Sequence, residues 1–121
     1  MIFMNNKTKG AIGESLACEY IEKKGFSILA KNWRFSRVGE IDIIAKDKNT
    51  LVFIEVKTRT TTSFGHPIEA VDSRKISQMK TVASLYLAET KEDFKSVRFD
   101  AIAVLGDKNP KITHYKDILR Y

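Results

Sequence analysis

The segment Gly39–Lys57, GEIDIIAKDKNTLVFIEVK, decides the fold, because it predicts two β-strands joined by a short polar turn. We place the strands at Glu40–Lys46 and Leu51–Lys57, with Asp47–Thr50 as the turn-prone joint. Charged residues interrupt these otherwise apolar strands: Glu40, Asp42, Glu55 and Lys57. A purely structural hairpin would confine such charge to its turn or to a solvated face.

The length of the joint determines which side chains share a face of this hairpin. An even number of joint residues pairs Lys46 with Leu51 and sets Asp42 opposite Glu55, whereas an odd number shifts the pairing by one. In the even register one face is entirely apolar and belongs to the core: Ile41, Ile43, Ala45, Val52, Ile54 and Val56. This clean partition favours the even register, with the charged residues together on the opposite face.

Two carboxylates on neighbouring strands repel each other, since side chains directly across a pair of strands lie about 5 Å apart. A cation between Asp42 and Glu55 would remove this repulsion, and Mg²⁺ is commonly bound by one or two carboxylates together with waters and phosphate oxygens. Lys57, on the same face, would then hold an attacking water. The alternative is a solvated face on which cross-strand salt bridges offset the repulsion.

The remaining pattern extends the hairpin into an α/β domain. Hydrophobic periodicity and end signals predict two helices and three further strands: a helix at Lys9–Lys24, a strand at Phe26–Arg34, a helix from Asp72 or Ser73 to Glu89, a strand at Val97–Leu105 and an edge strand at Lys111–Tyr115. The order α-β-β-β-α-β-β predicts a mixed central sheet flanked by helices. The 121 residues suit a single domain, with residues 1–8 as a flexible N-terminal tail.

Composition narrows the class of partner. The net charge of +6 favours nucleic acid, because basic side chains that neutralise phosphates release condensed counterions. No apolar stretch approaches the roughly 20 residues of a membrane span, and the start lacks the features of a signal peptide. A single cysteine, Cys18, excludes an internal disulfide. We therefore expect a cytoplasmic protein with no membrane partner.

A family resemblance appears once the separate motifs are placed in order. Its motifs are Gly13-Glu14, Asn32-Trp33-Arg34, Gly39-Glu-Ile-Asp42, Phe53-Ile-Glu-Val-Lys-Thr-Arg59 and Arg98-Phe-Asp100. Together they resemble the bacterial YraN-type family, whose members are placed in the PD-(D/E)xK nuclease-like superfamily. The resemblance covers the chain from about Lys9 to Tyr115. The same layout is more distantly similar to archaeal Holliday-junction resolvases.

The resemblance implies a restriction endonuclease-like core and phosphodiester cleavage that depends on Mg²⁺ or Mn²⁺. It implies that Asp42 and Glu55 are the metal ligands, that Lys57 positions the water, and that Glu14 completes the catalytic site. One departure is Ile41, which stands where the superfamily name has a proline. By analogy with resolvases, whose junction substrates have two-fold symmetry, a homodimer is also implied.

Further residues are candidates for contact with nucleic acid: Arg34, Arg37, Arg59, Lys75 and Gln78. Trp33 and Phe35 are candidates for stacking on bases, although aromatic residues beside a strand often belong to the core. The expected function is a metal-dependent nuclease acting on DNA rather than RNA, including branched or recombining DNA. The alternative is a non-catalytic nucleic-acid-binding module on the same scaffold.

Overall fold

The computed structural model describes residues 6–63 and 65–120 and confirms the predicted order of helices and strands. Two short 3₁₀ turns, η1 and η2, are added to that order. The elements are α1 (Asn6–Lys23), β1 (Ser27–Phe35), β2 (Gly39–Asp47), β3 (Thr50–Arg59), η1 (Pro67–Ala70), α2 (Ser73–Glu89), β4 (Ser96–Leu105), β5 (Lys111–Tyr115) and η2 (Ile118–Arg120).

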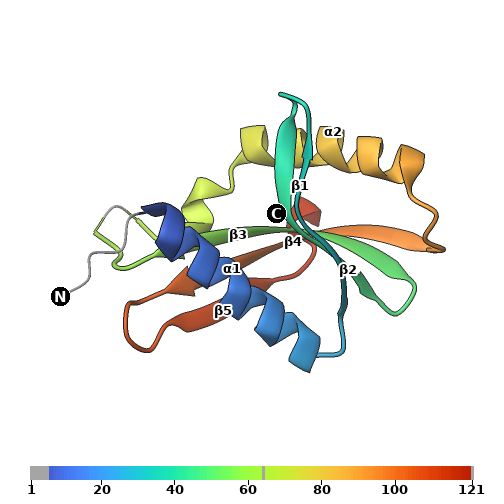
Figure 1. Cartoon of the computed structure of the whole chain (residues 1–121). Coiled ribbons are helices and arrows are strands. Elements are labelled where there is room, and N and C mark those ends of the chain that lie inside the picture. The colour runs from blue at the N-terminus through green and yellow to red at the C-terminus, as the bar shows by residue number, and fades with distance from the viewer. Residues whose placement is uncertain (1–5, 64, 121) are drawn as a thin grey trace.

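The five strands form one mixed sheet in the order β1-β2-β3-β4-β5 (Figure 1). The pair β3–β4 is parallel and the other three pairs are antiparallel. A parallel pair requires a crossover connection, and α2 supplies it between β3 and β4. The edge strand predicted at Lys111–Tyr115 is β5, with the same bounds.

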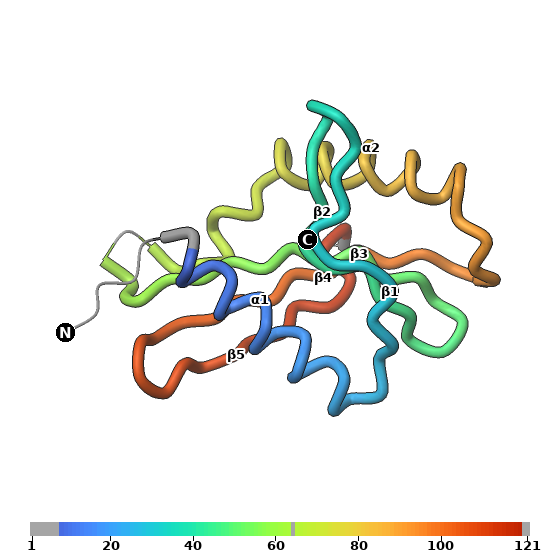
Figure 2. Tube along the Cα trace, in the orientation of Figure 1, coloured from blue at the N-terminus to red at the C-terminus, as the bar shows by residue number. Residues whose placement is uncertain are grey.

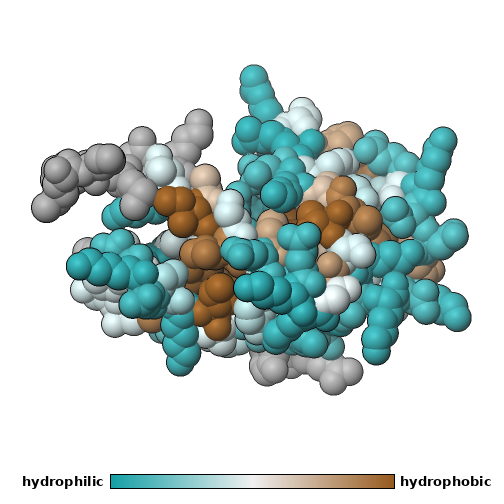
Figure 3. Space-filling model, turned by 60° about the horizontal axis from the view of Figure 1, so that its bottom comes forward, coloured by the Kyte–Doolittle hydropathy of each residue, from teal (hydrophilic) through white to brown (hydrophobic). Residues whose placement is uncertain are grey.

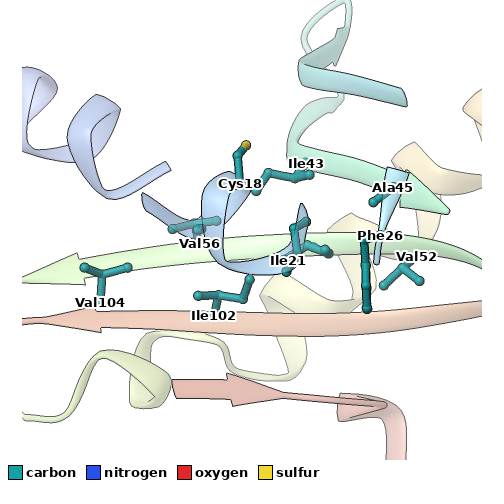
Figure 4. Packing of buried hydrophobic residues seen from close by; sticks show 11 residues of the cluster. Cys18, Ile21, Phe26, Ile43, Ala45, Val52, Val56, Ile102 and Val104 are labelled. Atoms are coloured by element: carbon teal, nitrogen blue, oxygen red, sulfur yellow. The ribbon is translucent and has the colours of Figure 1, made fainter. Parts of the chain in front are cut away.

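The two helices pack on opposite faces of the sheet (Figure 1). On the first face, Cys18 and Ile21 of α1 lie against Ile43 and Val56, as Figure 4 shows. On the second face, the side chains of α2 pack against alternate residues of the same strands: Ile44, Leu51, Phe53, Phe99 and Ala101 meet Met79, Val82 and Ala83. The central strands are therefore buried on both sides over most of their length.

This arrangement corrects the predicted division of the hairpin into one core face and one polar face. The predicted polar face is core wherever α2 covers it, and Phe53 there is fully buried. Ile41, predicted to share a face with Ile43, instead belongs to the cluster under α2. Strand β2 changes its neighbours between these two residues, so strict alternation fails there.

The ends of the helices show two further differences in detail. Helix α1 begins at Asn6, so residues 6–8 of the predicted tail are its first turn, and residues 1–5 lie outside the described residues. Gly25 has φ of 94°, which suits a glycine after the helix end. Helix α2 begins as predicted, because the side chain of Asp72 accepts a hydrogen bond from the backbone N–H of Lys75.

Strand β2 pairs with β1 and β3 over different lengths, which opens the sheet at one end. The β2–β3 ladder runs only from Asp47–Thr50 to Ile43–Ile54, whereas the β1–β2 ladder continues to Phe35–Gly39. The even register is thus confirmed, but the ladder stops one pair short of Asp42 and Glu55. Beyond that point the β1–β2 hairpin stands away from the rest of the sheet and rises beside α2 (Figures 1 and 2).

On the face seen in Figure 3, hydrophilic side chains dominate and surround the rim. Apolar residues show mainly in the middle of that face. Among the helices of residues 6–63 and 65–120, none has the length and apolar character needed to cross a membrane.

Candidate active site

The separation of β2 from β3 creates the candidate site. Once the ladder has ended, the backbone N–H of Val56 has no carbonyl of β2 opposite it and donates instead to Asp42 Oδ2, at 2.8 Å. A carboxylate therefore takes the place of a backbone acceptor at the fork between the strands. This bond fixes Asp42 beside the next part of β3, where Glu55 and Lys57 lie.

A cleft of about 560 Å³ opens at this fork. It is lined by residues from α1, β2, β3 and the position just after β3: Lys9, Gly10, Glu14, Asp42, Glu55, Val56, Lys57, Thr58, Arg59 and Thr60. All four predicted catalytic residues, Asp42, Glu55, Lys57 and Glu14, are among them. Three separate elements thus bring these side chains to one accessible place.

Glu55 is the most buried acid in the cleft, with 3% of the residue exposed. Its Oε1 lies 3.4 Å from Lys57 Nζ, and its Oε2 lies 3.5 Å from Lys75 Nζ. Oε2 has no hydrogen-bond partner among the described residues, although it is buried. A buried oxygen without such a partner is costly, which marks Glu55 Oε2 as a position suited to a ligand.

The electrostatics of Glu55 agree with this geometry. Burial and the nearby charge of Asp42 raise the pKa of Glu55 from 4.5 to about 7, against the opposing attraction of Lys75 and Lys57. The two lysines therefore compensate only part of the cost of ionising Glu55. A further positive charge in the cleft would favour the ionised carboxylate.

Glu14 brings a third carboxylate from α1. Burial and the charge of Asp42 raise the pKa of Glu14 from 4.5 to about 6, while a hydrogen bond from Asn32 opposes the rise. Helix α1 reaches the cleft because Gly13 has no side chain: a Cβ there would collide with Thr58 of β3. The glycine next to Glu14 in the sequence thus allows the close approach of α1 to β3.

Asn32 is a site residue that the analysis of charged residues alone missed. With its amide nitrogen turned toward the acids, Nδ2 lies 2.9 Å from Glu40 Oε1 and 3.1 Å from Glu14 Oε2. Asn32 adopts φ of 50°, a conformation that asparagine tolerates better than most residues. The sequence did contain one signal for its role, because Asn32 belongs to the Asn32-Trp33-Arg34 motif.

Lys75 and Gln78 join α2 to the site. Lys75 Nζ donates to Gln78 Oε1 at 3.0 Å, and Gln78 Nε2 donates to the carbonyl of Val38 at 3.4 Å, in the β1–β2 hairpin. Because Lys75 also pairs with Glu55, this series of contacts connects the hairpin with the cleft. Neither Lys75 nor Gln78 is among the residues lining the cleft.

The three arginines predicted to contact nucleic acid lie in two places. Arg59 is exposed at the cleft, where its Nη1 donates to the carbonyl of Thr58 at 2.9 Å. Arg34 and Arg37 are exposed on the hairpin, away from the residues that line the cleft. Contact with nucleic acid remains a prediction for all of these residues.

The donor set of the cleft can be compared with the needs of a divalent cation. In residues 6–63 and 65–120, no three His, Cys, Asp or Glu side chains are already arranged as a metal-binding group. Asp42 and Glu55 nevertheless supply two oxygen donors at one cleft, and Mg²⁺ commonly takes one or two carboxylates, with waters and phosphate oxygens completing its shell. The buried Oε2 of Glu55 adds a donor that has no hydrogen bond. The side chains of Asp42 and Glu55 therefore fit a divalent cation such as Mg²⁺.

Comparison with known proteins yields one family. The sequence model of the uncharacterised protein family UPF0102, the YraN family, matches residues 13–104. A UPF0102 protein of Dictyoglomus thermophilum is 41% identical over 116 residues, which cover 96% of this chain and 98% of the relative. A UPF0102 protein of Geotalea daltonii is 46% identical over 115 residues, covering 93% and 90%. The match includes Glu14, Asp42, Glu55 and Lys57.

Proposed function

The chain belongs to the uncharacterised family UPF0102, and from this premise and the geometry of the cleft we propose that it is a metal-dependent nuclease. The proposed reaction is hydrolysis of phosphodiester bonds in DNA, including branched or recombining DNA. The observation that carries the proposal is Glu55, a buried carboxylate beside Asp42 and Lys57 in an open cleft, whose Oε2 has no hydrogen-bond partner in the part of the chain that the structure describes.

Each residue of the cleft has a distinct role in this proposal. Asp42 and Glu55 would hold Mg²⁺ or Mn²⁺, and the hydrogen bond from Val56 N–H orients Asp42 for that purpose. When bound, the ion supplies electrostatic stabilisation of the negative charge that develops on the phosphate. Lys57 Nζ, held by Glu55 Oε1, offers its remaining N–H donors to the attacking water or to a phosphate oxygen. Lys9 and Arg59 add positive charge at the cleft for the neighbouring phosphates.

Lys75 has a role that its sequence position alone did not define. Its ammonium lies 3.5 Å from Glu55 Oε2, the oxygen that the proposed ion would use. Lys75 therefore partly neutralises Glu55 in the metal-free protein. On ligand binding it would retain Gln78 as a partner, since Gln78 Oε1 lies 3.0 Å from its Nζ.

A second function is favoured by the same lysines. Because Lys57 and Lys75 already flank Glu55, the cluster also suits a non-catalytic nucleic-acid-binding module that uses the net charge of +6. Such a module would bind with steep salt dependence and without any requirement for a metal. A nuclease requires Mg²⁺ or Mn²⁺ for turnover.

The decisive experiment is a cleavage panel of single-stranded, duplex, flapped and four-way DNA, together with RNA. Each substrate is incubated with Mg²⁺, with Mn²⁺ and with a chelator. We expect metal-dependent cleavage of DNA by the wild type, and a loss of about a hundred- to a thousandfold in each of Asp42→Asn, Glu55→Gln and Lys57→Met, as for loss of a transition-state contact. Lys46→Met is the matched control, because Lys46 is similarly half-buried but pairs with Glu92. Equal cleavage by wild type and Glu55→Gln would reject the assignment.

A further inference from the structure

The far end of the β1–β2 hairpin combines exposed apolar and basic side chains. Phe35 and Val38 are 38% and 40% exposed, although both are large and hydrophobic. Arg34 and Arg37, also exposed, stand between and beside them. Apolar surface rimmed by charge marks an interaction site, and the positive sign of the charge indicates a polyanionic partner.

The hairpin is held in a fixed position relative to α2. Trp33 packs edge-on against Tyr86 of α2, with ring centroids 5.3 Å apart, and its other neighbour is the ring of Phe35 at 6.2 Å. Gln78 of α2 donates to the carbonyl of Val38. The tip is thus presented from a rigid base, and Phe35 extends a continuous row of aromatic rings out to the surface.

The tip lies at a definite distance from the cleft. Phe35 pairs with Gly39, three residues before Asp42, so at about 3.3 Å per strand residue Phe35 lies about 10 Å along the hairpin from the fork. Successive phosphates of one DNA strand are about 3.4 Å apart along the axis. A DNA strand that places a phosphate in the cleft would therefore bring a base about three nucleotides away to Phe35.

The chemistry of the tip suits an unpaired base better than a base-pair edge. The exposed ring of Phe35 has no hydrogen-bonding group with which to read a base edge, although Arg34 and Arg37 beside it could contact guanine. An aromatic ring stacks on any unpaired base, and the flanking arginines can contact phosphates without regard to sequence. Resting on the function proposed above, we infer that this hairpin is a DNA-binding arm whose Phe35 stacks on an unpaired base about three nucleotides from the bond to be cleaved.

The test measures binding in the presence of a chelator, so that no cleavage takes place. One DNA duplex carries a single unpaired 2-aminopurine and the other is fully paired. For the wild type we expect tighter binding of the unpaired duplex by about five- to 150-fold, the range that corresponds to 1–3 kcal/mol of stacking, with quenching of the 2-aminopurine fluorescence. Phe35→Leu keeps apolar contact with Trp33 but has no ring, and should lose both the preference and the quenching.

Three variants serve as controls. Phe35→Tyr retains a ring and should keep the preference. Phe94→Leu removes another exposed phenylalanine, 40% exposed and outside the hairpin, and should change nothing. Arg37→Ala should weaken binding of both duplexes equally and reduce the salt dependence by about one counterion.

Several results would overturn the proposed arm. They are an unchanged preference in Phe35→Leu, an equal loss in Phe94→Leu, or capture of anionic lipid vesicles with no binding of DNA. The outcome is independent of catalysis. A protein that cleaves no substrate but retains the Phe35-dependent preference would refute the nuclease and support the arm. A protein that cleaves DNA but does not respond to Phe35→Leu would do the reverse.

Discussion

Two buried acids on adjacent strands of this sheet have opposite environments. Glu55 on β3 and Asp100 on β4 are the charged residues that are buried in the part of the chain the structure describes. Asp100 accepts hydrogen bonds from Arg98 Nε at 2.9 Å, from Arg98 Nη2 at 3.0 Å and from the backbone N–H of Asp117 at 2.9 Å. His114 Nε2 lies 2.8 Å from Asp100 Oδ2 as well. Glu55, by contrast, has one carboxylate oxygen, Oε2, that receives no hydrogen bond from residues 6–63 or 65–120.

The same contrast appears in the proton affinities. Burial raises the pKa of both acids, but at Asp100 the hydrogen bonds from His114, Arg98 and Asp117 outweigh burial and lower the pKa below its usual value. At Glu55 the two lysines do not outweigh burial and Asp42, and the pKa rises to about 7. A fully bonded buried acid stabilises the fold, whereas an incompletely bonded one at an open cleft is suited to a ligand.

Removing the charge of Asp100 tests the structural side of this comparison and should have the largest effect. We expect Asp100→Asn to lower the free energy of unfolding by about 3–5 kcal/mol at pH 7, because it breaks a buried ion pair and leaves Arg98 partly unpaired. Urea denaturation measures the change. Since the folded pKa of Asp100 is lowered, its contribution is present above the unfolded pKa and disappears as pH falls.

The control for this variant is Asp107→Asn, an exposed acid just after β4, which should change stability by less than about 0.5 kcal/mol. If Asp100→Asn lowered the free energy of unfolding no more than that control does, the hydrogen bonds around Asp100 would not stabilise the fold.

Removing the charge of Glu55 tests the other side and should have the opposite sign. Each tenfold change in proton affinity is worth about 1.4 kcal/mol, so a pKa raised from 4.5 to about 7 corresponds to at most about 3 kcal/mol. Because the folded pKa is raised, the metal-free wild type loses this stability as pH rises from about 4.5 to about 7. Glu55→Gln should therefore be more stable than wild type at pH 8 and nearly equal to it at pH 4.5.

Urea denaturation at the two pH values, with chelator present, gives this difference, and Glu92→Gln, an acid paired with Lys46 outside the cleft, is the control. Were Glu55→Gln destabilised at pH 8, the pairs with Lys57 and Lys75 would form a structural ion cluster, and the binding-module alternative would gain support.

The sequence alone predicted the hairpin and its register because alternation and a two-residue turn leave few alternatives. Lys46 pairs with Leu51 as predicted, across the turn Lys48-Asn49. The predicted alternation failed at Ile41, which lies under α2. The point at which β2 leaves β3 depends on the positions of β1 and α2 rather than on the local sequence pattern. Burial of both faces of β3 was missed for a related reason: Phe53 between charged neighbours is compatible with either a solvated face or a helix-covered one.

The candidate site divides in the same way. Spacing and family resemblance together selected Glu14, Asp42, Glu55 and Lys57, and all four line one cleft. The bond from Val56 N–H to Asp42 could not be predicted, because it exists only where the backbone ladder has ended. Spacing could not predict the ion pair between Lys75 and Glu55 either. Helix α2 lies in the connection between β3 and β4, and sequence distance alone does not say which of its residues reaches β3.

A divalent cation bound in the cleft should give Glu55 the compensating partner that Asp100 already has, and should therefore stabilise the folded protein. At a Mg²⁺ concentration ten times its dissociation constant, linkage predicts a gain of about 1.4 kcal/mol in the free energy of unfolding of the wild type. Asp42→Asn and Glu55→Gln should show no gain, and Glu92→Gln should match the wild type. Because the ligand must be deprotonated and the pKa of Glu55 is about 7, Mg²⁺ should bind more tightly at pH 8 than at pH 6.

Isothermal titration calorimetry of each variant measures the affinity directly, and thermal unfolding with and without Mg²⁺ measures the gain in stability. An equal gain in Glu55→Gln would mean that Mg²⁺ binds somewhere other than this cleft.

The smallest expected effect concerns Asn32, which connects the hairpin with the third acid. The hydrogen bond from Asn32 lowers the pKa of Glu14, so its removal should move that pKa above the present value of about 6. The effect of losing the side-chain amide must be distinguished from the effect of straining the backbone, because Asn32 has φ of 50° and alanine there would add strain. Asn32→Gly removes the amide and keeps the conformation accessible, whereas Asn32→Ala adds the strain.

The pKa of Glu14, followed by NMR titration of its carboxyl carbon, should rise in both variants, and the free energy of unfolding should fall by less than about 1 kcal/mol in Asn32→Gly. Asn109→Ala, in the exposed loop before β5, is the matched control and should leave the pKa of Glu14 unchanged. A pKa that rose in Asn32→Ala but not in Asn32→Gly would trace the effect to backbone strain rather than to the amide. Glu14 would then be held by α1 and the close approach at Gly13, and the hairpin would have no direct influence on the acids of the cleft.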